Sequence, residues 1–289
     1  MGMREKRKIA LILILPAMVI LVGAVIFPLI YSINVALRHY DLRMPTEVYP
    51  FVGMDNFVRA FFDHEFLYSL QLTSTFILTG TILQLSLGIG VAYLLSKIAW
   101  RKYIIPMIVI PTLTPPIVAG YMGIIIFHPQ GVVNYLLSTL GLIRSKILWY
   151  SSPETALLTC VLVDTWQWYP FIALIVLAGI LSVPQELVDA ARVDGASELK
   201  IFTKITLPLI KNVIAIALIF RILEMLRVFD VIYVMTYGGP GISTQVTNFY
   251  AYLVGFHYWD LGYASAIGWI MVLILSIGVT YYMKLWRVE

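Results

Sequence analysis

Long apolar segments alternate with short polar ones along the 289 residues of the chain. The apolar segments lack the alternation of a half-buried strand, and they are long enough to cross a bilayer as helices. The pattern predicts an all-α membrane protein with six spanning helices, at about residues 9–31, 66–96, 103–127, 154–181, 209–235 and 261–283.

The third apolar segment is unusual because it carries four prolines. Proline removes a backbone donor and clashes with the preceding turn, so it kinks or ends a helix. Inside a membrane the freed carbonyl groups need a partner from the protein or from water. We therefore expect a kinked or partly unwound helix around Pro106, Pro111, Pro115 and Pro116.

Basic residues are distributed unevenly among the polar segments. An even number of spans puts both ends of the chain on one side, and that side then holds most of the 20 lysines and arginines. Basic residues concentrate in cytoplasmic loops. The distribution predicts that both termini and the loop 182–208 are cytoplasmic.

The composition excludes a water-soluble globular protein. Hydrophobic residues make up 60% of the chain and charged residues 12%, against about 25% charged in soluble domains. The net charge of +4 comes from the basic loops, so we predict no nucleic-acid partner. We predict one transmembrane domain over residues 1–289.

Enzyme and metal motifs are absent from the sequence. No G-x-x-x-x-G-K-[ST], G-x-S-x-G or H-E-x-x-H segment occurs, and the glycine-rich stretch 238–241 has no lysine. The four histidines lack the spacing of metal ligands, and the single cysteine, Cys160, lies in an apolar segment. The chain is predicted to have no catalytic residue, metal site or bound cofactor of its own.

Charged residues recur every third position in the fifth apolar segment. Residues three apart lie on the same side of a helix, so opposite charges there can pair. An isolated charge near the middle of a bilayer costs about 2.5–3.5 kcal/mol, so these side chains pair or face water. Two interpretations remain: a self-neutralising ladder that fixes this helix to its neighbours, or the polar wall of a solute path. The residues are Arg221, Glu224, Arg227 and Asp230, followed by Tyr233.

The fourth apolar segment carries a carboxylate and an amide among aromatic rings. Proteins commonly hold sugars this way, with hydroxyl groups on the polar side chains and ring faces on the aromatics. The alternative is aromatic packing around one buried acid. Gln84 of the second segment could add hydrogen bonds. The residues are Asp164, Trp166, Gln167, Trp168 and Tyr169.

The loop 182–208 is predicted to form two short helices. Ser182 with Gln185 fits a capping box, and Gly195 can take the left-handed conformation that ends the first helix. The second helix would place Leu199, Phe202 and Ile205 on one face. Two helices between two spans suggest a docking element, although an ordinary loop would have a similar composition.

This loop resembles a known motif. Asp189-Ala190-Ala191, then Gly195, then Ile205-Thr206-Leu207-Pro208 is similar to the E-A-A…G…I-x-L-P motif in permease subunits of prokaryotic ABC importers. Asp189 stands where many members have glutamate. Further blocks resemble the carbohydrate-uptake branch, of maltose and glycerol-phosphate type: residues 28–32, 51–57, 228–236, 238–241 and 262–266.

The resemblance implies a type I (MetI-like) permease bundle in the cytoplasmic membrane. Its partners would be a second homologous permease, two cytoplasmic ATPases that bind ATP and Mg²⁺, and an external solute-binding protein. The ATPase-coupling residues would be Glu186, Asp189, Ala190, Ala191, Arg192, Asp194 and Gly195.

The solute would be a sugar. Glycerol phosphate or a polyol is the alternative, and an ion-coupled secondary transporter is a further one. The candidate path residues are Asp164, Trp166, Gln167, Glu224, Arg227, Asp230 and Tyr233. Arg221, Glu224 and Arg227 depart from the family's usual pattern.

Overall fold

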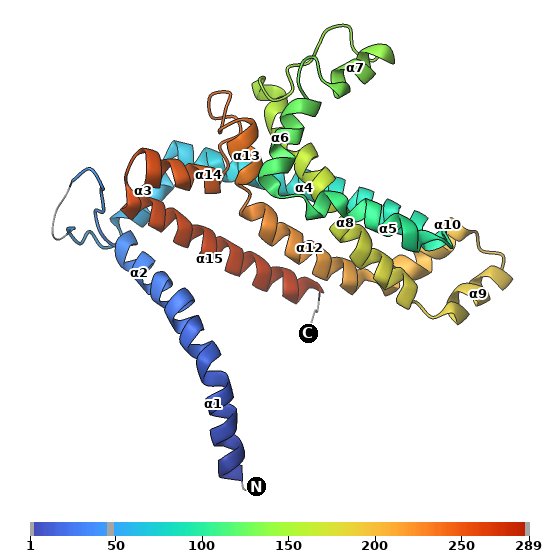
Figure 1. Cartoon of the computed structure of the whole chain (residues 1–289), viewed down its shortest axis with the longest axis horizontal. Helices are drawn as coiled ribbons and strands as arrows, with labels where there is room; N and C mark the ends of the chain where they lie inside the picture. The colour runs from blue at the N-terminus through green and yellow to red at the C-terminus, as the bar shows by residue number, and fades with distance from the viewer. Residues whose placement is uncertain (1–2, 45–48, 287–289) are drawn as a thin grey trace. The chain divides into compact units, whose positions relative to one another are not determined.

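A computed structural model describes residues 3–44 and 49–286, and this part of the chain is predominantly helical (Figure 1). Its helices are α1 Met3–Leu21, α2 Phe27–Ala36, α3 Asp55–Phe62, α4 His64–Lys97, α5 Arg101–Leu113, α6 Pro116–Ile126, α7 Val132–Thr139, α8 Pro153–Ser182, α9 Gln185–Val193, α10 Glu198–Ile201, α11 Leu207–Leu209, α12 Lys211–Leu226, α13 Asp230–Met235, α14 Thr247–Tyr252 and α15 Leu261–Trp286. Three single π-helical turns connect some of them: Val22–Ile26, Phe202–Thr206 and Leu253–His257.

The chain divides into two compact units. The first comprises Met1–His64 with Ala251–Ile274, and the second comprises Glu65–Tyr250 with Leu275–Glu289. In the first unit Asn56 donates to the carbonyls of Ala36 and Arg38, at 2.8 and 2.9 Å. The second unit holds all the candidate site residues.

Membrane-spanning helices agree in number with the sequence prediction. Within the described residues, four helices are long and apolar enough to cross a bilayer: Leu11–Ala36, His64–Lys97, Pro153–Ser182 and Leu261–Lys284. Two bent pairs also qualify, Arg101–Leu113 with Pro116–Ile126 and Glu198–Leu209 with Lys211–Leu226. Counting each pair as one span gives six.

The proline-rich third span is broken, as expected. α5 and α6 meet at an angle of 94° around Thr114 and Pro115 (Figure 1). The carbonyl of Thr114 accepts a hydrogen bond from Gln167 Nε2 at 2.7 Å, and Thr112 Oγ1 donates to the carbonyl of Gln167 at 2.8 Å. A side chain of α8 therefore satisfies the backbone that the break exposes.

The prediction of one continuous helix over 209–235 is wrong. α12 ends at Leu226, and a new helix, α13, begins at Asp230. α13 packs along α6, where a Cβ on Gly120 would lie 3.1 Å from the Val234 side chain. α13 is therefore a separate helix that packs closely on α6.

The loop helices also differ from the prediction. Ser182 Oγ donates back to the carbonyl of Gly179, and α9 begins after Pro184 without a side-chain cap, so the capping box is wrong. Gly195 does take the left-handed conformation, with φ of 78°. The predicted apolar face of the second helix is not the one observed: Leu199 is exposed and Ile205 partly buried, while Ile201, Phe202 and Thr206 are buried.

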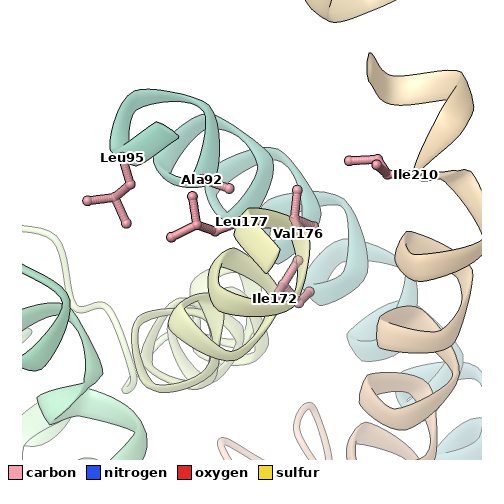
Figure 2. Close-up of a cluster of buried hydrophobic side chains, with 6 residues drawn as sticks. All are labelled: Ala92, Leu95, Ile172, Val176, Leu177 and Ile210. Carbon is pink, nitrogen blue, oxygen red and sulfur yellow. The ribbon is translucent and has the colours of Figure 1, made fainter. Parts of the chain in front are cut away.

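Apolar packing holds α4 and α8 together near their C-terminal ends. Gly88 of α4 lies so close to α8 that an added Cβ would come within 2.7 Å of Ile172. Small residues at such contacts allow helices in membranes to approach closely. A buried cluster extends from there to the start of α12 (Figure 2): Ala92, Leu95, Ile172, Val176, Leu177 and Ile210.

Candidate functional site

Three polar side chains from α4, α8 and α12 form a closed, buried cluster. Arg221 donates from Nε to Gln84 Oε1 at 2.7 Å and from a terminal nitrogen to Asp164 Oδ2 at 2.8 Å. Gln84 Nε2 donates to the same carboxylate oxygen at 2.7 Å. We call Gln84, Asp164 and Arg221 the buried triad.

The triad is shielded from solvent. The side chain of Arg221 is 1% exposed and that of Asp164 is 9% exposed. The ring of Trp168 lies 4.8 Å from the guanidinium carbon of Arg221, which adds a cation–π contact. Buried charges persist only when they are paired and hydrogen-bonded, and the triad meets both conditions with groups from three helices.

A small cavity of about 80 Å³ adjoins the triad where α12 breaks off and α13 begins. Its volume suits a few water molecules. The lining is polar on one side and aromatic on the other. It consists of Pro116, Asp164, Gln167, Trp168, Arg221, Glu224, Arg227, Val228, Phe229, Asp230 and Val231.

The charged residues of the fifth span do not form one continuous ladder of ion pairs. Arg221 pairs across helices with Asp164, whereas Glu224 pairs with Arg227 at 2.5 Å within its own segment. The Glu224 and Arg227 side chains are 49% and 67% exposed. Asp230 lies beyond the helix break and lines the cavity. The pairing of Arg221 with Asp164 fits the interpretation in which the charges fix this helix to its neighbours. The polar wall of a solute path stays a prediction for Glu224, Arg227 and Asp230.

Two of the predicted path residues lie outside this cavity lining. Trp166 is half a helical turn away from Asp164 and Trp168, and it lines a separate apolar cavity of about 170 Å³ between α6 and α8. Tyr233 stacks on Phe229, with ring centroids 5.4 Å apart. The cavity thus joins Asp164, Gln167, Glu224, Arg227 and Asp230.

The list of candidate path residues includes Trp166 and omits Trp168, but it is Trp168 that lines the cavity. On α8 it follows Asp164 by four residues, and residues four apart share a helix face. That spacing was the available signal for Trp168 and against Trp166.

The loop helix α9 has one covered side and one open side. Ala191 is buried and Val188 partly buried. On the opposite side, an apolar stripe of Leu187, Ala190 and Val193 is exposed, flanked by Glu186 and Asp194. Val193 is 88% exposed. We call this open side the loop face.

The other polar loop residues form a chain of ion pairs. Arg192 contacts Asp189 at 3.0 Å and Glu198 at 2.9 Å, and Glu198 also pairs with Lys97 at the end of α4. Hydrogen bonds from Lys97 and Arg192 lower the pKa of Glu198 to about 2. Glu198 is therefore ionised at any pH near neutrality.

A family model matches residues 84–285 of the chain, under the description "binding-protein-dependent transport system inner membrane component". The matched segment contains the triad, the cavity and the loop face.

Curated relatives extend over almost the whole chain. The trehalose/maltose transport system permease protein MalF of Thermococcus litoralis is 35% identical, with 96% of this chain and 93% of the relative covered. The sulfoquinovosyl glycerol transport system permease protein SmoG of Agrobacterium fabrum is 32% identical, covering 98% and 92%.

A solved structure shares the fold. It is a chain of a bacterial ABC transporter involved in the import of the acidic polysaccharide alginate, with a TM-score of 0.85. The match covers 98% of this chain and 96% of that one at 23% identity. The prediction of a MetI-like permease fold is confirmed.

The triad generates a stability prediction. Arg221→Met leaves the Asp164 carboxylate buried without its cation, so it is expected to cost about 3–5 kcal/mol of folding free energy. Asp164→Asn added to Arg221→Met removes that charge and should recover most of the loss. Thermal unfolding of the purified variants in detergent measures both effects.

Arg227→Met is the matched control, because its exposed pair with Glu224 is worth about 1 kcal/mol or less. An Arg221→Met protein as stable as the Arg227→Met protein would contradict the structural role of the triad.

Proposed function

The chain belongs to the family of binding-protein-dependent transport system inner membrane components, and on that premise we propose that it is the membrane-spanning permease subunit of an ATP-driven saccharide importer. It is a multi-pass membrane protein. The proposal separates into a solute path, a coupling surface and a set of partners.

The observation that carries the proposal is the polar cavity at the break between α12 and α13. Ionisable side chains within membrane helices are costly, and they typically mark solute or ion pathways. Broken helices are a recurrent way to place polar groups at such depths. Here the exposed Glu224–Arg227 pair and Asp230 lie beside the buried triad, at one end of a broken span.

The chemistry of the cavity suits a saccharide. Trp168 offers a ring face and Asp230 a carboxylate for hydroxyls, beside the Asp164 carboxylate of the triad and the Gln167 side chain. The cavity of about 80 Å³ would have to widen during transport to admit a saccharide. Two relatives are named for the transport of trehalose and maltose and of sulfoquinovosyl glycerol. These names support a sugar or a glycosylated glycerol as the transported solute.

The energy source lies in other chains. The sequence has no P-loop lysine motif to bind ATP phosphates, so two cytoplasmic ATPase subunits would bind ATP and Mg²⁺. A second homologous permease would complete the pathway, and an external solute-binding protein would deliver the sugar. The loop face, an exposed apolar stripe with acidic flanks, would dock on the ATPase.

Uptake by the complete transporter tests the function. We expect proteoliposomes with ATP inside and the loaded solute-binding protein outside to accumulate radiolabelled saccharide, and to continue when ion gradients are abolished. Uptake that needs an ion gradient and proceeds without ATP would instead support an ion-coupled carrier.

The path assignment predicts a pattern of thiol labelling. In a Cys160→Ala background, Arg227→Cys should react with a membrane-impermeant thiol reagent in at least one transport state, because that position is exposed beside the cavity. Phe220→Cys is the control, since Phe220 is an exposed apolar side chain on the same helix and should face lipid. Equal protection of both cysteines in every state would exclude Arg227 from an aqueous path.

The docking assignment predicts the effect of a charge on the loop face. Val193→Glu should reduce co-purification of the ATPase subunits about tenfold, because an unpaired carboxylate would be buried in the contact. Val193→Leu keeps the apolar surface and should behave as wild type. Wild-type co-purification and uptake by Val193→Glu would show that Val193 does not lie in the contact.

A further inference from the structure

The three helices of the buried triad are joined to the loop 182–208 in different ways. α8 leads into the loop and α12 follows it, so both are connected to it through the chain. α4 ends at Lys97, 101 residues before Glu198 in the sequence. Any movement of the loop therefore reaches α4 only through non-covalent contacts.

Some of those contacts belong to the apolar cluster that Ala92 and Leu95 of α4 form with α8 and Ile210. The contacts between α4 and the polar side chains of the loop lie at the rim of a cavity. A space of about 320 Å³ separates α9 from the end of α4, so the two helices are not packed directly together there. Its lining includes Tyr93, Ser96 and Lys97 from α4, and Gln185, Val188 and Arg192 from α9.

Two bridges cross this region. In the first, the rings of Tyr93 and Phe202 lie 4.5 Å apart. In the second, Glu198 uses both carboxylate oxygens, Oε2 toward Lys97 and Oε1 toward Arg192 at 2.9 Å. Arg192 contacts Asp189 at 3.0 Å, and Asp189 accepts a hydrogen bond from Gln185 at 3.0 Å. Glu198 is thus the point at which α4 joins the polar chain along α9.

We propose that Glu198 is a positioning residue that couples α9 to α4, so that displacement of the loop by the ATPase also moves α4. Gln84 lies 13 residues before Lys97 on the same helix, about 20 Å along its axis. Since Gln84 bonds both Asp164 and Arg221, movement of α4 reaches the polar cavity. This role rests on the proposed function, because it assigns a task within ATP-driven transport.

The test measures coupling as well as activity. Glu198→Gln and Lys97→Met are introduced into the complete transporter in proteoliposomes, and ATP hydrolysis and saccharide uptake are recorded together. We expect the ATPase subunits to remain bound and hydrolysis to continue, while the solute taken up per ATP falls about threefold, the scale set by an exposed ion pair. Lys97→Arg keeps the charge and should preserve the wild-type ratio.

A double-mutant cycle identifies the contact. If the two residues act through one interaction, Lys97→Met with Glu198→Gln should be no more impaired than Glu198→Gln alone. Lys200→Met is the matched control, because Lys200 is an exposed lysine on the same short helix outside the ion-pair chain, and its uptake per ATP should be unchanged.

The outcomes separate this inference from the proposed function. If Glu198→Gln still shows ATP-driven uptake with the wild-type amount of solute per ATP, the coupling role of Glu198 is wrong, while the proposed function stands. Losses that add in the double mutant would also overturn it, because the residues would then act separately. Absence of ATP-dependent uptake in the wild-type complex would overturn the proposed function and this role with it.

Discussion

The buried ion pair between Asp164 and Arg221, bridged by Gln84, constrains the rest of the second unit. Removing two charges from water is costly, and the cost is recovered only when the geometry of the pair is maintained. α4, α8 and α12 must therefore keep one register relative to each other at this level. Gly88 and the apolar cluster between α4, α8 and Ile210 allow the close packing that this register requires.

Two helix breaks lie at the same cavity. Pro116 begins the second half of one broken span, and residues 227–229 separate α12 from α13. The distal halves, α6 and α13, pack on each other. Residues at both breaks therefore line the same polar cavity. Gln167 also lines this cavity, and its amide donates a hydrogen bond to the backbone at the α5–α6 break. One side chain, Gln167, thus both satisfies the backbone at a helix break and lines the candidate solute path.

Much of this arrangement could be predicted from the sequence, because hydropathy, proline and glycine act locally. The six spans, the break at Pro115 and the left-handed Gly195 follow from such signals. The break after Leu226 could not be predicted, because no proline or glycine marks residues 227–229. The helix that follows the break packs against Gly120, and this contact joins segments far apart in the chain. For the same reason Arg221 was assigned to a ladder within its own helix, although its partners are on α4 and α8.

The low pKa of Glu198 sets the pH range over which its ion pairs with Lys97 and Arg192 stay charged. Pairing with Lys97 and Arg192 lowers the pKa below the ordinary value of 4.5 to about 2. The stabilisation from these contacts is complete above the ordinary pKa, declines as the pH falls below 4.5, and is gone once the pH has fallen through about 2. A fall of one or two pH units from neutrality therefore leaves these contacts between α4 and the loop ionised. Histidine-based contacts change their charge over the same pH range.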